Sequence, residues 1–382
     1  MELKISRIKL LNFILLLGLF QVTFIKFPYI NNYNIIKYSI ISCIGMIVLL
    51  NIKKNKNILD NKFKIMLLIY SVVIIYSGIT NNDNHAITNT AIESIMYIVT
   101  FWELFTIIPL IKRNVGDSFI YKSFFIISTF YIIVTDLFII FAKDLFMSRG
   151  EYYFIGNKFS VIYTHFNWLA FYLLNRTKYK SGLDIDFKIV LIMLLIVFIS
   201  FKISCMTGIV GIISFIVLAC LPLKIINNKN FGIIILIVSG LFPIIYKSVL
   251  NFASTRYFIT NVLHRDLSLT GRIVIYENIP KIIDKHVLWG YGYGSSYEVW
   301  FNALHYPNSQ NGLIDMIVET GIVSTAVFII MIRKIFKENN RIIKLIICMY
   351  LILSTFEITL GNMMVAWLAL LYSNKERNEV KE

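Results

Sequence analysis

Cationic side chains able to hold an anion occur in the polar stretch between residues 250 and 308. Arg256, Arg265 and Arg272 stand there in a neighbourhood with few other charges. An arginine suits a phosphate group because its planar fork donates two parallel hydrogen bonds and because it stays charged at any working pH. Loop arginines also bind lipid headgroups or nearby acids, so the residues alone leave both roles open.

The segment SLTGRIVIYENIPKIIDKHVLWGYGYGSS, residues 268–296, surrounds the last of these arginines. Its apolar residues at 273, 276, 279, 282 and 283 follow helical spacing, which predicts a short amphipathic helix lying in the membrane interface. Alternating glycines follow at Gly290, Gly292 and Gly294. No strand precedes them and the spacing is not that of a dinucleotide-binding loop, so they indicate either a tight turn or a close backbone approach.

The next segment, NALHYPNSQNGLIDMIVETGIVSTAVFIIMI at residues 302–332, starts polar and ends apolar. So many polar side chains at the point where a helix enters lipid indicate a functional role. Asp315 and Glu319 share one face of the first helical turns. Acids within a membrane usually face a protein interior or a cavity, and these two are also suited to pair with a loop arginine.

The elements that position these residues are membrane helices. The chain is 57% hydrophobic and only 15% charged, with a mean hydropathy of +0.71, whereas soluble domains carry about 25% charged residues. Continuous apolar runs such as IVLIMLLIVFI have the length of a membrane-spanning helix and lack the alternation of a barrel strand. The sequence therefore predicts an all-α polytopic membrane protein.

Charge between the apolar runs predicts the topology. About twelve spans are expected, at residues 8–26, 35–52, 64–80, 91–111, 119–141, 159–175, 187–203, 205–223, 231–249, 309–332, 342–356 and 360–373. With both termini in the cytoplasm, the short cytoplasmic loops carry Lys and Arg and the short outer loops nearly none, as the positive-inside rule requires. The net charge of +15 is explained by these loops, so no nucleic acid partner is expected.

This topology divides the chain into four parts. Residues 1–249 are expected to form an N-terminal bundle, 250–308 a large extracytoplasmic loop with short amphipathic helices, 309–373 the C-terminal membrane helices, and 374–382 a cytoplasmic tail. Loops as long as the one at 250–308 are usually functional. Any chemistry is therefore expected at the outer surface of the bacterial cytoplasmic membrane.

The motifs resemble those of the O-antigen polymerase and O-antigen ligase superfamily (Wzy and WaaL). TGRIVIYENIPKIIDKHVLWGYGYGSS is similar to its S/T-G-R, helix and P-L-x-G-x-G pattern, and NSQNGLIDMIVETGIV to the segment that follows. Asn311 and Gly321 keep the family's spacing. YFIGNKFSVIYTHFNWLAFYLL, residues 153–174, looks like a segment of capsule-repeat polymerases.

The sequence departs from the family pattern at two positions. Gln310 stands where the family has a histidine, and glutamine cannot take up a proton. Met206, in ISCMTGIVGI, stands where the family has an arginine; Lys202, on the same predicted helical face, is a substitute.

The resemblance implies that the protein joins sugars outside the membrane, from a polyprenyl-diphosphate-linked oligosaccharide and without metal, nucleotide sugar or other cofactor. This chemistry needs cations for the diphosphate and, unless bond breaking leads the reaction, a base for the acceptor hydroxyl. Arg272 and Arg265 are the first candidates for the diphosphate, and Arg149 and Lys202 the second.

His305 is the candidate base because an imidazole titrates near neutral pH, although a lone interfacial histidine is often only a polar anchor. His264 and His286 are rivals in the same loop. Gln310 and Asn311 are suited to orient sugar hydroxyls. Gly292, in the glycine pair of the pattern, completes the set of substrate-binding candidates.

The expected function is polymerisation of lipid-linked repeat units into a surface polysaccharide such as a capsule or O-antigen. A ligase that moves a finished chain to another acceptor is the nearest alternative. A flippase or transporter of the same lipid-linked glycan is the second, with Glu103, Asp136 and Glu357 marking a transport path. The expected partners are membrane lipid, a chain-length regulator and a flippase.

Overall fold

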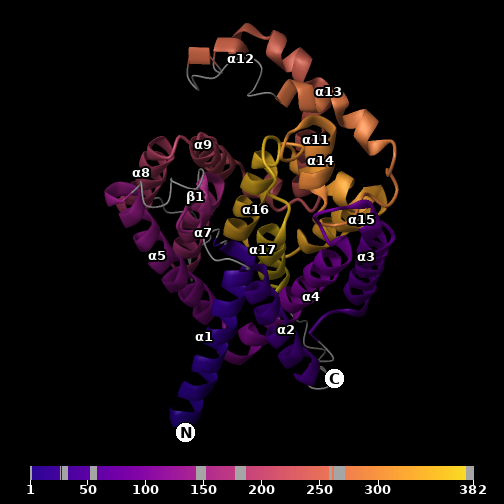
Figure 1. Ribbon diagram of the computed structural model, residues 1–382. Helices are drawn as coiled ribbons and strands as arrows, with labels where there is room; N and C mark the ends of the chain where they lie inside the picture. Colours follow the sequence, from indigo (N-terminus) through magenta and orange to yellow (C-terminus); the bar gives the residue numbers. More distant parts are fainter. Residues whose placement is uncertain are drawn as a thin grey trace.

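The computed structural model describes residues 2–25, 27, 33–51, 58–142, 152–176, 186–257, 260–261 and 272–375. Their regular structure is helical, apart from one antiparallel pair of two-residue strands, β1 (Tyr152–Tyr153) and β2 (Gly156–Asn157). The all-α expectation is therefore confirmed (Figure 1).

A helix lies at each of the twelve positions where the sequence predicts a span. They are α1 (Glu2–Phe24), α2 (Tyr33–Asn51), α3 (Asn61–Thr80), α4 (Thr90–Val115), α5 (Asp117–Phe141), α7 (Lys158–Arg176), α8 (Phe187–Lys202), α9 (Thr207–Cys220), α11 (Phe231–Asn251), α15 (Gly312–Ile335), α16 (Arg341–Leu353) and α17 (Asn362–Tyr372). Among the described residues, α3, α4, α5 and α15 are long and apolar enough to cross a membrane. Membrane crossing by the other helices stays a prediction.

Shorter helices connect these elements. They are η2 (Asn82–Asn84), α10 (Leu223–Ile226), α12 (Ala253–Tyr257), α13 (Arg272–Ile283) and α14 (Ser296–Leu304). The last three fall within the predicted large loop. In α13 the buried side chains are Ile275, Tyr276, Ile279 and Ile282, which recur at the spacing of one helical face. This helix coincides with the amphipathic segment predicted at 273–283.

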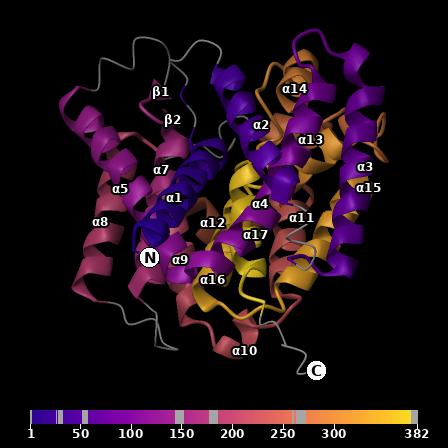
Figure 2. The same ribbon diagram turned by 90° about the horizontal axis from the view of Figure 1, so that it is seen from below.

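The core is centred on α16 and α17. Almost every residue of these two helices is buried, because their sequences are apolar on all sides. Trp367 of α17 stacks on Phe171 of α7 with ring centroids 4.9 Å apart. Figure 2 shows the pair between a group containing α5, α7 and α8 and a group containing α3 and α15.

Polar contacts define two opposite ends of the bundle. At one, the Asp60 end, Asp60 before α3 contacts Lys334 of α15 at 2.6 Å and Lys375 after α17 at 2.9 Å. At the other, the Arg272 end, Asn81 after α3 donates to the carbonyl oxygen of Gly290 at 3.2 Å. Figure 1 shows α12 and α13 at the edge of the molecule, next to α11 and α14.

Helix α15 is broken at Gly321, where φ is 77° and ψ is 171°. The sequence predicts one continuous span there, because its apolar pattern runs through the break. Residues 287–292 cover the interrupted backbone. Tyr291 and Gly292 donate their N–H groups to the carbonyl oxygens of Val318 and Glu319, at 2.8 and 2.9 Å. In the other direction, the N–H of Ile322 donates to the carbonyl oxygen of Val287 at 2.9 Å.

Candidate active site

Arg272, the first residue of α13, contacts the connection between α16 and α17. Its Nη2 donates to Oε1 of Gln310 at 3.2 Å, to the carbonyl oxygen of Phe356 at 3.1 Å and to Oε1 of Glu357 at 3.3 Å. The side chains of Arg272 and Glu357 are only 18% and 11% exposed. Charges shielded from water interact more strongly than charges at an open surface. The arginine of the S/T-G-R pattern thus lies in a sheltered polar cluster.

Glu357 is the acid of this cluster, which we call the Glu357 cluster: Arg272, Gln310, Glu357, Thr207 and Lys158. The Thr207 side chain, at the start of α9, forms a hydrogen bond with the Glu357 carboxyl group. Burial of that carboxyl raises the pKa of Glu357 to about 7, against the opposing influence of Arg272, Lys158 and Thr207. A carboxyl group with such a pKa can exchange a proton near neutral pH.

Two tyrosine hydroxyls lie near the Glu357 carboxyl. Tyr163 of α7 and Tyr276 of α13 are close enough for its charge to act on them. Both hydroxyl oxygens are buried and have no hydrogen-bond partner among the described residues. A buried polar group left unsatisfied costs about 1–3 kcal/mol. Such groups are suited to complete their hydrogen bonds with the hydroxyls of a ligand.

Asn311 fixes the position of the cluster. Its Oδ1 accepts a hydrogen bond from the N–H of Ile314 at 3.1 Å, which caps the first turn of α15. Its Nδ2 donates to the carbonyl oxygens of Ser239 and Thr355, at 2.9 and 3.2 Å. The side chain is fully buried. Asn311 therefore ties α11, α15 and the α16–α17 connection together and sets the place of its neighbour Gln310.

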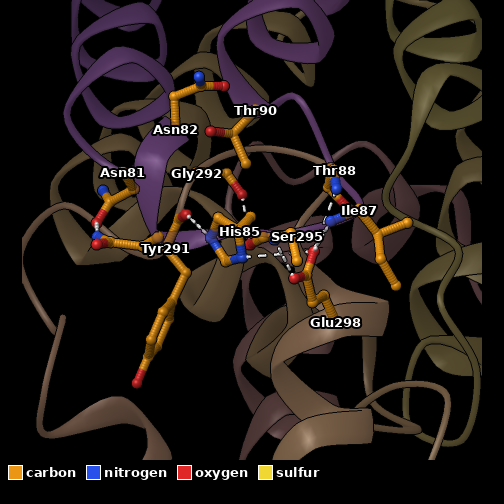
Figure 3. Close-up of polar contacts among 12 residues, drawn as sticks. Asn81, Asn82, His85, Ile87, Thr88, Thr90, Tyr291, Gly292, Ser295 and Glu298 are labelled. Atoms are coloured by element: carbon orange, nitrogen blue, oxygen red, sulfur yellow. Dashed lines mark hydrogen bonds and ion pairs between the residues drawn. The ribbon is translucent and has the colours of Figure 1, made fainter.

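A second polar cluster joins the α3–α4 connection to α14 (Figure 3). Glu298 accepts hydrogen bonds from the backbone N–H groups of Ala86, Ile87 and Thr88, at 2.6, 3.2 and 3.1 Å. Nδ1 of His85 lies 3.7 Å from Glu298, and its Nε2 lies 2.8 Å from the carbonyl oxygen of Tyr291. We call this arrangement the Glu298 clasp.

Glu298 is engaged by the protein's own groups. Burial of the side chain would raise its pKa, but the three backbone hydrogen bonds and the charge of His85 outweigh burial and lower it. The carboxylate is therefore held in its ionised form. These contacts make the Glu298 clasp a device that holds α14 in place.

The glycine-rich turn packs between the clasp and the break in α15. Gly290, Gly292 and Gly294 all have positive φ, at 72°, 98° and 88°. A Cβ atom on Gly292 would lie 2.7 Å from Cβ of Thr90, and one on Gly290 would lie 2.5 Å from the backbone nitrogen of Gly321. The sequence left open a tight turn and a close backbone approach. Both are present, because all three glycines have positive φ and the backbone of Gly321 lies against Gly290.

The other sequence-derived candidates lie elsewhere. His305 ends α14, is exposed, and has its ring 5.5 Å from that of Phe301. Lys202 is exposed at the end of α8, with its Nζ 5.6 Å from the ring of Phe198. His286 packs on Tyr291 with rings 4.2 Å apart. Arg149, Arg265 and His264 lie outside the described residues.

Among the candidates, the structure brings Arg272 and Gln310 together and adds Glu357, Thr207 and Lys158 to them. From the sequence alone, Glu357 is a candidate only for the transport path of the alternative function. A signal was present, since an acid in the short connection TFEITLGN between two apolar helices needs a partner. The other two acids of that set lie elsewhere: Asp136 pairs with His165 at 3.2 Å, and Glu103 is buried in α4.

The comparisons with known proteins give one match. Residues 189–329 match the family model described as O-antigen ligase (Wzy_C). This range runs from α8 into α15 and contains Arg272, Gln310 and Gly292, but not Lys158 or Glu357. No curated protein and no solved structure matches the chain. The chain is thus a multi-pass membrane protein whose residues 189–329 match the O-antigen ligase family model, in agreement with the resemblance to the O-antigen polymerase and ligase superfamily.

Proposed function

We propose that the protein is a membrane glycosyltransferase that polymerises polyprenyl-diphosphate-linked oligosaccharide repeat units into a surface polysaccharide. The O-antigen ligase domain supports a glycan-processing enzyme that acts on lipid-linked oligosaccharides. The observation that carries the proposal is the contact between Arg272 and Glu357, 3.3 Å apart in a sheltered cluster at the Arg272 end. A cation and a proton-accepting group are the two groups that such a transfer requires.

The reaction joins an acceptor hydroxyl to C1 of the sugar that the diphosphate carries. The bond between C1 and the hydroxyl oxygen forms, the bond between C1 and the phosphate oxygen breaks, and the diphosphate leaves with its electron pair. Glu357 takes the hydroxyl proton, and Arg272 stabilises the negative charge that develops on the leaving group. Gln310 and the hydroxyls of Tyr163 and Tyr276 orient the sugars.

The pairing of Arg272 with Glu357 couples proton transfer from the acceptor hydroxyl to the departure of the diphosphate. While Glu357 is ionised, the positive charge of Arg272 is partly neutralised by the carboxylate 3.3 Å away. Proton transfer to Glu357 removes that negative charge at the moment when the diphosphate develops its own. The electrostatic stabilisation is therefore greatest in the transition state, which is where it accelerates the reaction.

Two candidates compete for the role of base. The imidazole of His305 favours this residue, which lies in the segment that leads into Gln310. Its ring is exposed and contacts Phe301. Glu357 contacts Arg272 directly, so we assign the proton transfer to Glu357 and keep His305 as the alternative.

The test is reconstitution of the purified protein in liposomes with its lipid-linked repeat unit and without nucleotide sugar, followed by gel electrophoresis. A ladder of lengths establishes a polymerase. A single product that forms only with an added acceptor establishes a ligase. Movement of the lipid-linked glycan across the bilayer without any new glycosidic bond contradicts the proposal and favours a transporter. Glu357→Gln in the same assay links the activity to the Glu357 cluster.

A further inference from the structure

The Asp60 end contains a cavity that glycosyl transfer at the Arg272 end does not use. Its volume is about 350 Å³, and it lies between the segment before α3, the last turns of α4 and the residues that follow α17. Its charged lining residues are Asp60, Lys112, Arg113 and Lys375. The apolar side chains Ile58 and Pro109 complete part of the wall. The cavity therefore combines a cationic rim with an apolar surface.

Most of these charges have identified partners. Asp60 contacts Lys375 at 2.9 Å and Lys334 at 2.6 Å. Lys112 contacts Asp117 at 2.9 Å and also donates to Oδ1 of Asn374 at 2.9 Å. Two carboxylates thus face the three lysines.

Arg113 adds a fourth cation. It is exposed on the last turn of α4, and no acid partner for it is found in the part of the chain that the structure describes. The cavity consequently has an excess of positive charge, and the guanidinium of Arg113 is the donor best suited to bind an anion there. Two parallel N–H donors match two oxygens of a phosphate group.

Membrane orientation explains why lysines and arginines accumulate at this end of the bundle. It does not explain why they surround a cavity with apolar walls. A basic pocket between membrane helices, at the level of the headgroups, fits the phosphate of an anionic lipid whose glycerol and acyl chains rest on apolar side chains. Free phosphate would use the cationic rim but gain nothing from Ile58 and Pro109.

We propose that the cavity at the Asp60 end is a binding site for the phosphate headgroup of an anionic phospholipid, with Arg113 and Lys112 as its principal ligands. A lipid held there contacts the segment before α3, the end of α4 and the end of α17 at once. It therefore connects elements that the contacts of Asp60 and Lys112 already hold together, and it stabilises their packing.

The experiment measures lipid binding to the full-length purified protein by native mass spectrometry. Phosphatidylglycerol is compared with phosphatidylcholine of the same acyl chains, for the wild type, Arg113→Gln and Lys229→Gln. Lys229 is an exposed cation between α10 and α11, so its replacement changes the net charge equally away from the cavity. The readout does not involve glycosyl transfer, so it stands whatever the enzyme's reaction is.

We expect phosphatidylglycerol to bind the wild type and Lys229→Gln equally, and Arg113→Gln about fivefold more weakly, as loss of one cation near a headgroup predicts. The same lipid should raise the thermal unfolding temperature of the wild type more than that of Arg113→Gln. Equal binding to all three proteins, or an equal loss in both variants, overturns the proposal. Stabilisation by inorganic phosphate as large as that by the lipid overturns the assignment to a lipid.

Discussion

Arg272 and Glu357 lie 85 positions apart in the chain, yet Nη2 of the arginine is 3.3 Å from Oε1 of the glutamate. Helix α13 presents the arginine, and the α16–α17 connection presents the acid. Asn311 holds this connection against α15 through the carbonyl oxygen of Thr355. The relationship places a permanent cation beside a carboxyl group whose pKa burial raises to about 7.

The planar guanidinium of Arg272 is expected to be required for activity, and not only its charge. Arg272→Lys keeps the charge but loses the planar fork, so we expect polymer formation to fall about 10- to 100-fold while the protein remains folded and inserted. The measurement is the initial rate of ladder formation in liposomes. Arg256→Lys is the matched control, because Arg256 is exposed and its Nε donates to the carbonyl oxygen of Leu250. An unimpaired Arg272→Lys enzyme makes Arg272 a headgroup anchor.

The second prediction concerns pH. The folded-state pKa of Glu357 is raised from its ordinary value of 4.5 to about 7, so the carboxyl group is protonated and inactive as a base below that pH. We expect the wild-type rate to fall about tenfold per pH unit below 7 and to level off above it. Glu357→Gln should lower the rate about 10²- to 10⁴-fold and abolish this dependence. A pH profile unchanged in Glu357→Gln assigns the titrating group elsewhere.

His305 provides a separate prediction. Since its ring is exposed and contacts Phe301, we expect His305→Ala to retain the rate of glycosyl transfer within about threefold, the effect of an ordinary surface change. The same liposome assay measures it, with thermal unfolding as a check on folding. Loss of all polymer in His305→Ala together with an active Glu357→Gln would identify the histidine as the base.

The helices of this protein follow from its sequence because their signal is local. Apolar runs of sufficient length identify membrane helices one at a time, and the positions of all twelve coincide with helices of the structure. Arg272 and Gln310 could also be found, because each belongs to a short motif. The break at Gly321 could not, because the apolar residues on both sides continue one helical pattern.

The Glu357 cluster could not be found in the same way. Its members come from α7, α9, α13, the segment before α15 and the α16–α17 connection, so their meeting depends on how five separate parts of the chain pack. The sequence of a single chain does not show how these elements pack against one another. The glycine-rich turn shows the same limit. The backbone that approaches Gly290 belongs to the later helix α15, and the side chains that approach Gly292 and Gly294 belong to the start of α4 and the residues before it.

The Glu298 clasp gives a prediction about stability. Glu298→Gln removes the carboxylate that accepts from three backbone N–H groups, so we expect a loss of about 1–3 kcal/mol at pH 7. The folded-state pKa of Glu298 is lowered below 4.5. The contribution is therefore complete above pH 4.5 and is lost as the pH falls through the lowered pKa. Thermal unfolding of wild type and variant at several pH values measures the difference.

The control for this variant is Asp83→Asn, an exposed acid on the same α3–α4 connection. It removes one negative charge from the same region without touching the clasp, so its unfolding temperature should match that of the wild type. A wild-type unfolding temperature in Glu298→Gln as well would show that the clasp does not stabilise α14.

The last prediction concerns the break in α15. Gly321 has a φ of 77° and a ψ of 171°, a region that only glycine adopts readily and that costs other residues about 1–3 kcal/mol. A Cβ atom there would also lie 2.2 Å from the carbonyl oxygen of Leu288. We expect Gly321→Ala to lower the unfolding temperature and to displace residues 287–292. Gly361→Ala is the control, because its φ is −83° and no atom lies within 4 Å of the added methyl group. If both variants unfold at the same temperature, residues 287–292 do not depend on the break in α15 for their position.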